Sequence, residues 1–222
     1  MSYILNIETA TKSCSVALSK NGQLIGCHEE VSERYSHSEQ LTLFIQEVLT
    51  QNGLSQQDLD AIAFSSGPGS YTGLRIGLST AKGLCYALEI PLISVSTLEA
   101  MAQLMIDKHP MKIMCPMIDA RRMEVYCALF GSIQNPITAK VIDQDSFAEE
   151  LEKYPLLFFG DGADKCQQVL THSNAYFELG IYPSARGMLE LAFQKFSKKD
   201  FEDLAYYEPF YLKEFVAGVR AK

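Results

Sequence analysis

The fold of this chain is decided by residues 65–77, SSGPGSYTGLRIG, where three glycines fall within seven residues. An apolar run at residues 59–65 leads into this stretch and predicts a buried strand. The run that follows, residues 72–88, has helical periodicity and ends before Pro91, which cannot continue a helix. A strand, a glycine turn and a helix in succession predict an α/β protein, and the spacing of the glycines indicates what the turn does.

This glycine turn matches neither of the common phosphate-binding motifs. The pattern GxxxxGK followed by Ser or Thr fails because Thr72 stands where the second glycine belongs and no lysine follows Gly73. The GxGxxG pattern fails because its third glycine, Gly73, comes one residue late. Backbone N–H groups at the helix start remain able to hold an anion, but the spacing favours a tight turn with a positive φ at Gly67 or Gly69.

Three short apolar strands precede this region, at residues 3–8, 14–19 and 23–29. Asn21-Gly22, a strong hairpin signal, separates the last two, so we expect the three strands to be antiparallel. Ser36 and Glu39 fit a helix capping box and open a predicted helix to about Asn52. The chain is therefore expected to begin with a hairpin sheet that is followed by a helix.

A further strand at residues 92–95 and a helix at residues 96–108 complete the first half. The order is then three strands, a helix, a strand, a helix, a strand and a helix. Crossover helices join parallel strands, so the later strands are expected to be parallel. This order is found in the ribonuclease-H-like half of the actin-like ATPase (ASKHA) fold, which we therefore predict for this α/β chain.

The second half of the chain repeats the pattern in a reduced form, after a boundary near His109-Pro110. Its strands are expected at residues 112–118, 123–130, 138–142 and 156–159, and its helices after Ser146 and at residues 163–171 and 184–196. We therefore expect two ribonuclease-H-like lobes with mixed sheets, one of residues 1–109 and a smaller one of residues 110–222.

Composition and charge narrow the function classes. The chain is 47% hydrophobic and 21% charged, as globular proteins are, and its net charge of −8 argues against binding nucleic acid by bulk electrostatics. No run is long and apolar enough to span a membrane, and the N-terminus does not read as a signal peptide, so we expect a cytoplasmic protein. The six cysteines form no CxxC pair, and we expect buried, reduced thiols.

Two predicted helices, residues 36–52 and 72–88, carry more apolar residues than one buried face needs. Leu43 points away from the core face of the first helix, and Gly83 lies opposite the core face of the second. Gly77 and Gly83 each cost about 1 kcal/mol in a helix interior, which the close approach of another backbone would offset. We interpret the two helices as a docking surface for another protein; the alternative is that the chain's own second half covers them.

Polar residues at two turns are candidates for a remnant of a nucleotide site. The turn ETAT at residues 8–11 stands where actin-like phosphotransferases have Asp-x-Gly-Thr/Ser, so phosphate would be bound only weakly through side-chain hydroxyls. The turn DARR at residues 119–122 either meets a phosphate or carboxylate or makes surface ion pairs with Glu124 or Asp119. The full set is Glu8, Thr9, Thr11, Ser13, Asp119, Arg121 and Arg122.

No metal site and no catalytic residue is predicted. The four histidines, His28, His37, His109 and His172, include no HxxxH pair that would place two imidazoles on one helix face. The nucleophile elbow GxSxG is absent from the sequence as well.

Six segments carry a further signal: ILNIETAT, RYSHSEQL, SGPGSYTGLRIGLSTAKGL, ISVSTLEA, DARRMEVY and EPFYLKE. In this order, over most of the chain, they resemble the TsaB (YeaZ) family of bacteria. The resemblance implies an actin-like fold and a non-catalytic subunit, an inactive homologue of peptidase M22-like proteins, which dimerises with TsaD and activates it. TsaD, with TsaB and the ATPase TsaE, forms threonylcarbamoyladenosine next to the anticodon of tRNA.

The resemblance also implies partners and cofactors. The partners are a TsaD homologue, a TsaE homologue and a second copy of the chain, with tRNA contacted only indirectly and no membrane. No cofactor is required by the chain alone, and ATP or ADP is expected at an interface of the complex. The docking residues are Ser36, His37, Gln40, Leu41, Leu43, Phe44, Arg75, Ile76, Ser79, Thr80, Gly83 and Ala87.

Two other functions stand beside this one. An ATP-dependent transferase of the actin-like superfamily would act on its own through Glu8, Thr9, Thr11 and Asp119, and the strand order motivates it. A metalloprotease rests only on naming within the superfamily, and the missing HxxxH pair argues against it.

Overall fold

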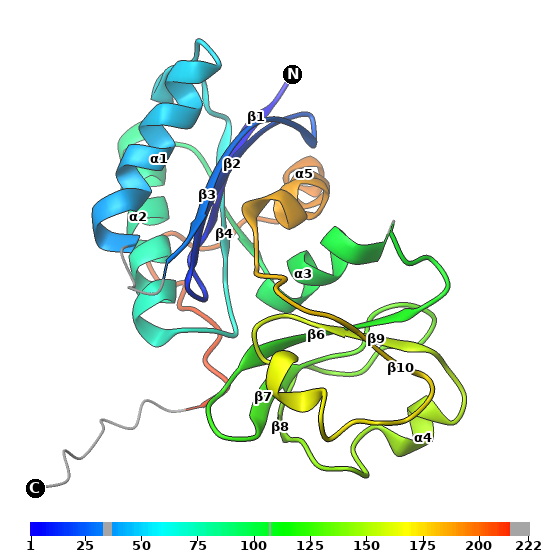
Figure 1. Ribbon diagram of the computed structural model, residues 1–222. Coiled ribbons are helices and arrows are strands. Elements are labelled where there is room, and N and C mark those ends of the chain that lie inside the picture. The colour runs from blue at the N-terminus through cyan, green and yellow to red at the C-terminus, as the bar shows by residue number, and fades with distance from the viewer. Residues whose placement is uncertain (33–36, 107, 214–222) are drawn as a thin grey trace, which may run out of the picture.

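The computed structural model describes residues 1–32, 37–106 and 108–213, which form two five-stranded sheets (Figure 1). The strands of the first sheet are β1 (Tyr3–Glu8), β2 (Ser13–Lys20), β3 (Gln23–Val31), β4 (Ala61–Ser65) and β5 (Leu92–Val95). Their order is β3-β2-β1-β4-β5. The pairs β1–β2 and β2–β3 are antiparallel, and β1–β4 and β4–β5 are parallel. The predicted strand order and directions of the first lobe are confirmed.

Local sequence explains the hairpin sheet. Asn21 and Gly22 have φ values of 50° and 80°, the left-handed conformations that a two-residue hairpin turn needs. β1 and β2 lie inside the sheet and are buried along almost their whole length, whereas the edge strand β3 is partly exposed and more polar. The hydrophobic pattern and the turn therefore set the same register.

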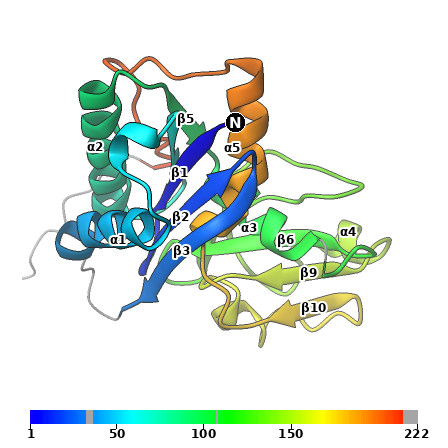
Figure 2. The ribbon, with the colours of Figure 1, turned by 90° about the horizontal axis from the view of Figure 1, so that it is seen from above.

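Helices cover both faces of the first sheet. α1 (His37–Gln51) and α2 (Tyr71–Leu88) lie together on one face, and α5 (Leu189–Lys198) lies on the other, with α3 (Thr97–Ile106) between the two sheets (Figure 1 and Figure 2). The apolar face of α1 packs on β2, and that of α2 packs on β4. A short 3-10 helix, η1 (Gln56–Asp58), precedes β4.

The second sheet repeats the plan of the first. Its strands are β6 (Ile113–Asp119), β7 (Glu124–Cys127), β8 (Thr138–Val141), β9 (Leu156–Phe159) and β10 (Ala175–Glu178). They follow the order β10-β9-β6-β7-β8, with β6 antiparallel to β7 and parallel to β9. β6 therefore takes the place that β1 has in the first sheet. The helix α4 (Ala148–Leu151) is only four residues long, so the second lobe is reduced, as predicted.

Two expectations for the second half need correction, and one strand was missed. The helix expected at residues 163–171 is a 3-10 helix, η2 (Asp164–Cys166), followed by turns, and the N–H groups of Ala163, Cys166 and Val169 bond to the third preceding carbonyl. The helix expected at residues 184–196 begins as a 3-10 helix, η3 (Ala185–Met188), before α5. β10 was not predicted, since four half-exposed residues give too short a pattern.

The end of the described chain returns to the first lobe. Met188 of η3 and Ala192 of α5 are fully buried and pack in one cluster with Ile4 of β1. This packing covers the face of the first sheet that α1 and α2 leave open. Residues 185–198 therefore pack on the first sheet, although the predicted second lobe of residues 110–222 includes them.

The cysteines agree with the expectation of reduced thiols: all six are free and five of them are buried. None of the helices in the described ranges has the length and hydrophobicity that a membrane span requires.

Candidate docking face and interlobe cavity

The glycine turn packs directly against the turn between β1 and β2. Gly67 has a φ of +112°, which confirms the predicted positive φ there. A Cβ atom on Gly69 would lie 2.4 Å from the carbonyl oxygen of Ala10. The backbone N–H of Ser70 donates to that same oxygen at 2.6 Å, and the Ser70 hydroxyl caps α2 by accepting from the N–H of Gly73 at 3.3 Å. The N–H groups of Ser70 and Gly73 therefore bond within the chain.

Close contacts with Thr9 explain why α2 has glycine at positions 73 and 77. A Cβ atom on Gly73 would lie 2.1 Å from the carbonyl oxygen of Thr9, and one on Gly77 would lie 2.3 Å from its Oγ1. Thr9 Oγ1 also donates to the carbonyl oxygen of Gly73 at 2.8 Å. Thr9 of this chain therefore makes the close approach that Gly77 permits. The expectation that another protein's backbone approaches Gly77 is wrong. A Cβ on Gly83 would meet no atom within 4 Å, so the expectation for Gly83 stays a prediction.

Glu8 is a buried carboxyl group at the end of β1. Its Oε1 accepts from the N–H of Ala10 at 2.6 Å and from the hydroxyl of Ser65 at 2.9 Å. Burial raises the pKa of Glu8 from 4.5 to about 7, because loss of solvent penalises the charged form more than these hydrogen bonds favour it. Glu8 therefore joins β1 to β4 in the core.

The raised pKa gives Glu8 a testable effect on stability. The unfolded chain loses this proton near pH 4.5 and the folded chain near pH 7, so the carboxyl lowers the free energy of unfolding as pH rises through this range. We predict that Glu8→Gln is increasingly more stable than wild type from about pH 5 to about pH 8, by up to about 3 kcal/mol. Urea unfolding at several pH values measures this, and a difference between the two proteins that does not change with pH would contradict it.

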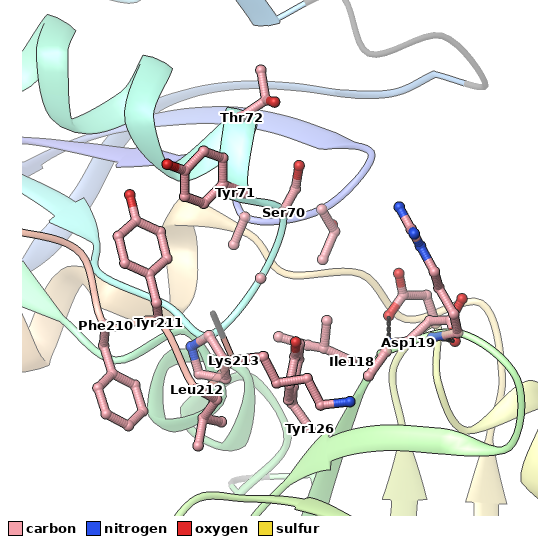
Figure 3. A pocket seen from close by; sticks show the side chains of 17 residues that line it. Ser70, Tyr71, Thr72, Ile118, Asp119, Tyr126, Phe210, Tyr211, Leu212 and Lys213 are labelled. Atoms are coloured by element: carbon pink, nitrogen blue, oxygen red, sulfur yellow. Dashed lines mark hydrogen bonds between the residues drawn. The ribbon is translucent and has the colours of Figure 1, made fainter. Parts of the chain in front are cut away.

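A cavity of about 430 Å³ lies between the two lobes (Figure 3). Residues 10–11 and 68–72 line it from the first lobe, and residues 118–121, Tyr126 and Asp161 line it from the second. Residues 210–213 at the end of the described chain form the remaining wall. Of the predicted nucleotide remnant, the lining includes Thr11, Asp119 and Arg121 but not Glu8, Thr9, Ser13 or Arg122.

Two of the four charged residues that line the cavity, Asp119 and Lys213, form ion pairs within the chain. Lys165 forms an ion pair with Asp119, and Lys213 forms one with Glu124. Asp161 accepts from the N–H of Asp119 at 3.1 Å, and burial raises the pKa of Asp161 to about 6. Thr9, whose hydroxyl was expected to meet phosphate, is buried and bonded to α2. Thr9 and Asp119, two residues of the predicted nucleotide remnant, are therefore already bonded within the chain.

The turn that carries Arg121 and Arg122 has a backbone conformation that the sequence did not predict. Arg121 and Arg122 have φ values of 73° and 52°, which sequence reasoning missed because their side chains do not favour this conformation. The N–H of Arg121 donates to Asp119 Oδ1 at 3.0 Å and so holds the turn. Within the described ranges neither guanidinium forms an ion pair, so the alternative of surface pairing with Glu124 or Asp119 is contradicted, and contact with a phosphate or carboxylate stays a prediction.

The outward faces of α1 and α2 lie side by side on the outer side of the first lobe (Figure 1). Leu43 of α1 is 54% exposed and Tyr86 of α2 is 81% exposed. We call six exposed residues of these two helices the docking face: Leu43, Arg75, Ser79, Gly83, Tyr86 and Ala87. Residues of the second half contact one side of α2, where Lys82 donates to the carbonyl oxygen of Ala205, but within the described chain they leave Leu43 and Tyr86 exposed.

The predicted docking residues divide by exposure. Gln40, Ile76 and Thr80 are half-buried beside the docking face. His37, Leu41 and Phe44 are buried inside the first lobe, which corrects their assignment to a partner surface. Leu41 and Phe44 belong to the core face of α1, and His37 Nε2 hydrogen-bonds the carbonyl oxygen of Thr11 at 2.8 Å. Ser36 lies outside the described residues.

Tyr86 was missed by the sequence reading, although the signal was present. It lies three residues after Gly83 on the outer side of α2, and it is more exposed than Leu43, at 81% against 54%. No group of three His, Cys, Asp or Glu side chains in the described ranges could hold a metal ion.

Two ribonuclease-H-like lobes with a cavity between them define an α/β protein of the actin-like ATPase fold. The family model described as TsaD, tRNA N6-adenosine threonylcarbamoyltransferase, matches residues 23–217. The tRNA threonylcarbamoyladenosine biosynthesis protein TsaB of Escherichia coli (strain K12) is 34% identical over 96% of each chain. The chain belongs to the TsaB (YeaZ) family.

Two further likenesses are informative. A Pseudomonas aeruginosa crystal structure, described as an uncharacterized protein with similarity to peptidase YeaZ, superposes with a TM-score of 0.84 at 27% identity and covers 96% of this chain and 100% of its own. The tRNA N6-adenosine threonylcarbamoyltransferase of Bacillus subtilis (strain 168) is 37% identical over 109 residues, 42% of this chain and 31% of that protein. One stretch of the chain is thus similar to a transferase of the same pathway.

Proposed function

We propose that this chain is a non-catalytic subunit that binds a TsaD-type transferase and activates it in the formation of threonylcarbamoyladenosine in tRNA. The names of its relatives support the pathway, and the likeness to the transferase itself supports a partner with a related fold. The observation that carries the proposal is the docking face, where two neighbouring helices expose Leu43 and Tyr86 to solvent. Surfaces of this kind mark protein–protein contact sites.

A related partner explains the composition of the docking face. Two pairs of similar helices pack as a four-helix layer when small residues let them approach. Gly83 is exposed, costs about 1 kcal/mol relative to alanine in a helix and has no neighbour within the described chain. A second helix lying across this position would use the space that Gly83 leaves.

Other parts of the proposal follow from charge and from the family. We propose that a TsaE homologue joins the complex and that ATP or ADP binds at an interface between subunits, since Thr9 and Asp119 of the predicted nucleotide remnant are already bonded within the chain. The net charge of −8 makes other subunits the ones that hold tRNA. The free chain would use the docking face to form a homodimer, which the transferase replaces, and the complex would act in the cytoplasm.

Size-exclusion chromatography with light scattering tests this proposal. The chain is measured alone and mixed with the TsaD homologue from the same organism. We expect a one-to-one complex in the mixture that replaces the homodimer. A chain that keeps the same mass with and without the transferase would contradict the proposal and would bring the ATP-dependent enzyme forward.

A further inference from the structure

An open hollow of about 510 Å³ lies where α1 and α2 meet, beside the docking face. Four hydroxyl residues, Ser38, Thr72, Ser79 and Thr80, line it together with Tyr71, Arg75 and Ile76. Arg75 is the only charged residue in this lining as described. The lining also includes Tyr71 and Thr72 in the first turn of α2, where the helix dipole favours negative charge. A cation, hydroxyl donors and a helix start together fit an anionic group.

Two tyrosines hold the guanidinium of Arg75. Its central carbon lies 4.1 Å from the ring centroid of Tyr71 and 6.0 Å from that of Tyr211. Its Nε donates to the hydroxyl oxygen of Tyr211 at 3.1 Å. The two rings lie 5.0 Å apart and stand side by side at the edge of the interlobe cavity (Figure 3). Within the described ranges no hydrogen bond or ion pair engages the two terminal nitrogens of Arg75.

Tyr211 belongs to a segment, residues 203–213, that runs along α2 and on to the second lobe; we call it the strap (Figure 1). Lys82 of α2 donates to the carbonyl oxygen of Ala205 at 3.2 Å, and the N–H of Phe210 donates to the carbonyl oxygen of Ser66 at 2.8 Å. Lys213 then pairs with Glu124 of β7. The strap is thus fixed at α2, at the glycine turn and at the second lobe.

We propose that the hollow receives a carboxylate side chain of the transferase, which Arg75 binds with its two terminal nitrogens, and that Tyr211 positions Arg75 for it. This inference rests on the proposed function and names the chemistry of the contact. The planar guanidinium binds a carboxylate through two parallel hydrogen bonds, and a stacked, hydrogen-bonded guanidinium loses less freedom when it does so. The strap makes this part of the docking surface depend on contacts with the second lobe.

Dissociation constants for the TsaD homologue test the proposal. We expect Arg75→Ala to weaken binding about tenfold at about 0.05 M salt, and less at about 0.5 M salt, because screening weakens the wild-type contact. Arg75→Lys keeps the charge but not the planar fork, so it should recover only part of the loss. Tyr211→Phe keeps the ring and removes the oxygen that accepts from Nε, and we expect about threefold weaker binding.

A double mutant of Arg75 and Tyr211 shows whether Tyr211 acts by positioning Arg75 or by contacting the transferase itself. Tyr211→Phe should have no further effect in a chain that carries Arg75→Ala. Tyr206→Ala is the control, because this strap tyrosine is 85% exposed, and its binding should match wild type. In the isolated chain, amide exchange of residues 71–79 should quicken with Tyr211→Phe and not with Tyr206→Ala.

The outcomes distinguish this proposal from the function on which it rests. Tight wild-type binding with no effect of Arg75→Ala would overturn the carboxylate contact and leave the subunit role standing. Full additivity of Arg75→Ala and Tyr211→Phe would overturn the positioning role of Tyr211. A wild-type chain that does not bind the transferase at all would overturn both the function and the contact.

Discussion

Leu43→Glu will fold like the wild-type chain and will fail to bind the transferase. Leu43 is 54% exposed on α1, so glutamate there meets water in the monomer and leaves the core unchanged. In the complex the same carboxylate would be buried against an apolar helix, and an unpaired buried charge costs several kcal/mol. We expect the dissociation constant to rise at least about 100-fold, as measured by titration calorimetry.

Leu179→Glu is the matched control for this prediction. Leu179 is 45% exposed, close to the value for Leu43, but it lies in the second lobe beyond β10 and away from α1 and α2. Its substitution makes the same change of charge and should leave binding unaltered. Unchanged binding of Leu43→Glu, or an equal loss in both variants, would show that the docking face does not meet the transferase.

Gly73→Ala will destabilise the fold by about 3 kcal/mol or more, whereas Gly83→Ala will stabilise it by up to about 1 kcal/mol. Both substitutions add one methyl group to the same helix. On Gly73 it would lie 2.1 Å from the carbonyl oxygen of Thr9, and a backbone atom cannot rotate away as a side chain can. On Gly83 it would meet no atom of the described chain within 4 Å. Urea unfolding measures the difference, at a chain concentration low enough to dissociate the proposed homodimer.

A small or equal effect of the two alanines would contradict the tight contact between α2 and the turn after β1. Gly77→Ala gives an intermediate case. Its methyl group would meet the side chain of Thr9, so Thr9→Ala in the same chain should relieve part of the loss that Gly77→Ala causes.

The first lobe could be predicted from sequence because its signals are local. Asn21-Gly22 sets the hairpin, and alternate runs of apolar residues and helical periodicity place β1 to β5 and α1 to α3. The second lobe gave weaker signals, since its strands are mostly four residues long and its helices short. The return of α5 to the first sheet could not be predicted, because it depends on contacts between residues nearly two hundred positions apart, such as Ile4 and Met188.

The candidate site was predicted only in part. Helical periodicity correctly placed Leu43 and Gly83 on the outside, and it also placed Leu41 and Phe44 on the core face, so their assignment to a partner conflicted with the pattern itself. The contact between Thr9 and Gly77 joins segments far apart in sequence and left no local signal. The strap was equally hidden, because a segment without regular structure shows no periodicity that would place Tyr211 on Arg75.

A reconstituted reaction shows whether this chain activates a catalytic relative. The TsaD homologue and the TsaE homologue from the same organism are incubated with unmodified tRNA and the substrates of the transferase, with and without this chain. Threonylcarbamoyladenosine is then measured by mass spectrometry of the digested tRNA. We expect product only when the wild-type chain is present, and little with Leu43→Glu. Equal rates with and without the chain would contradict it.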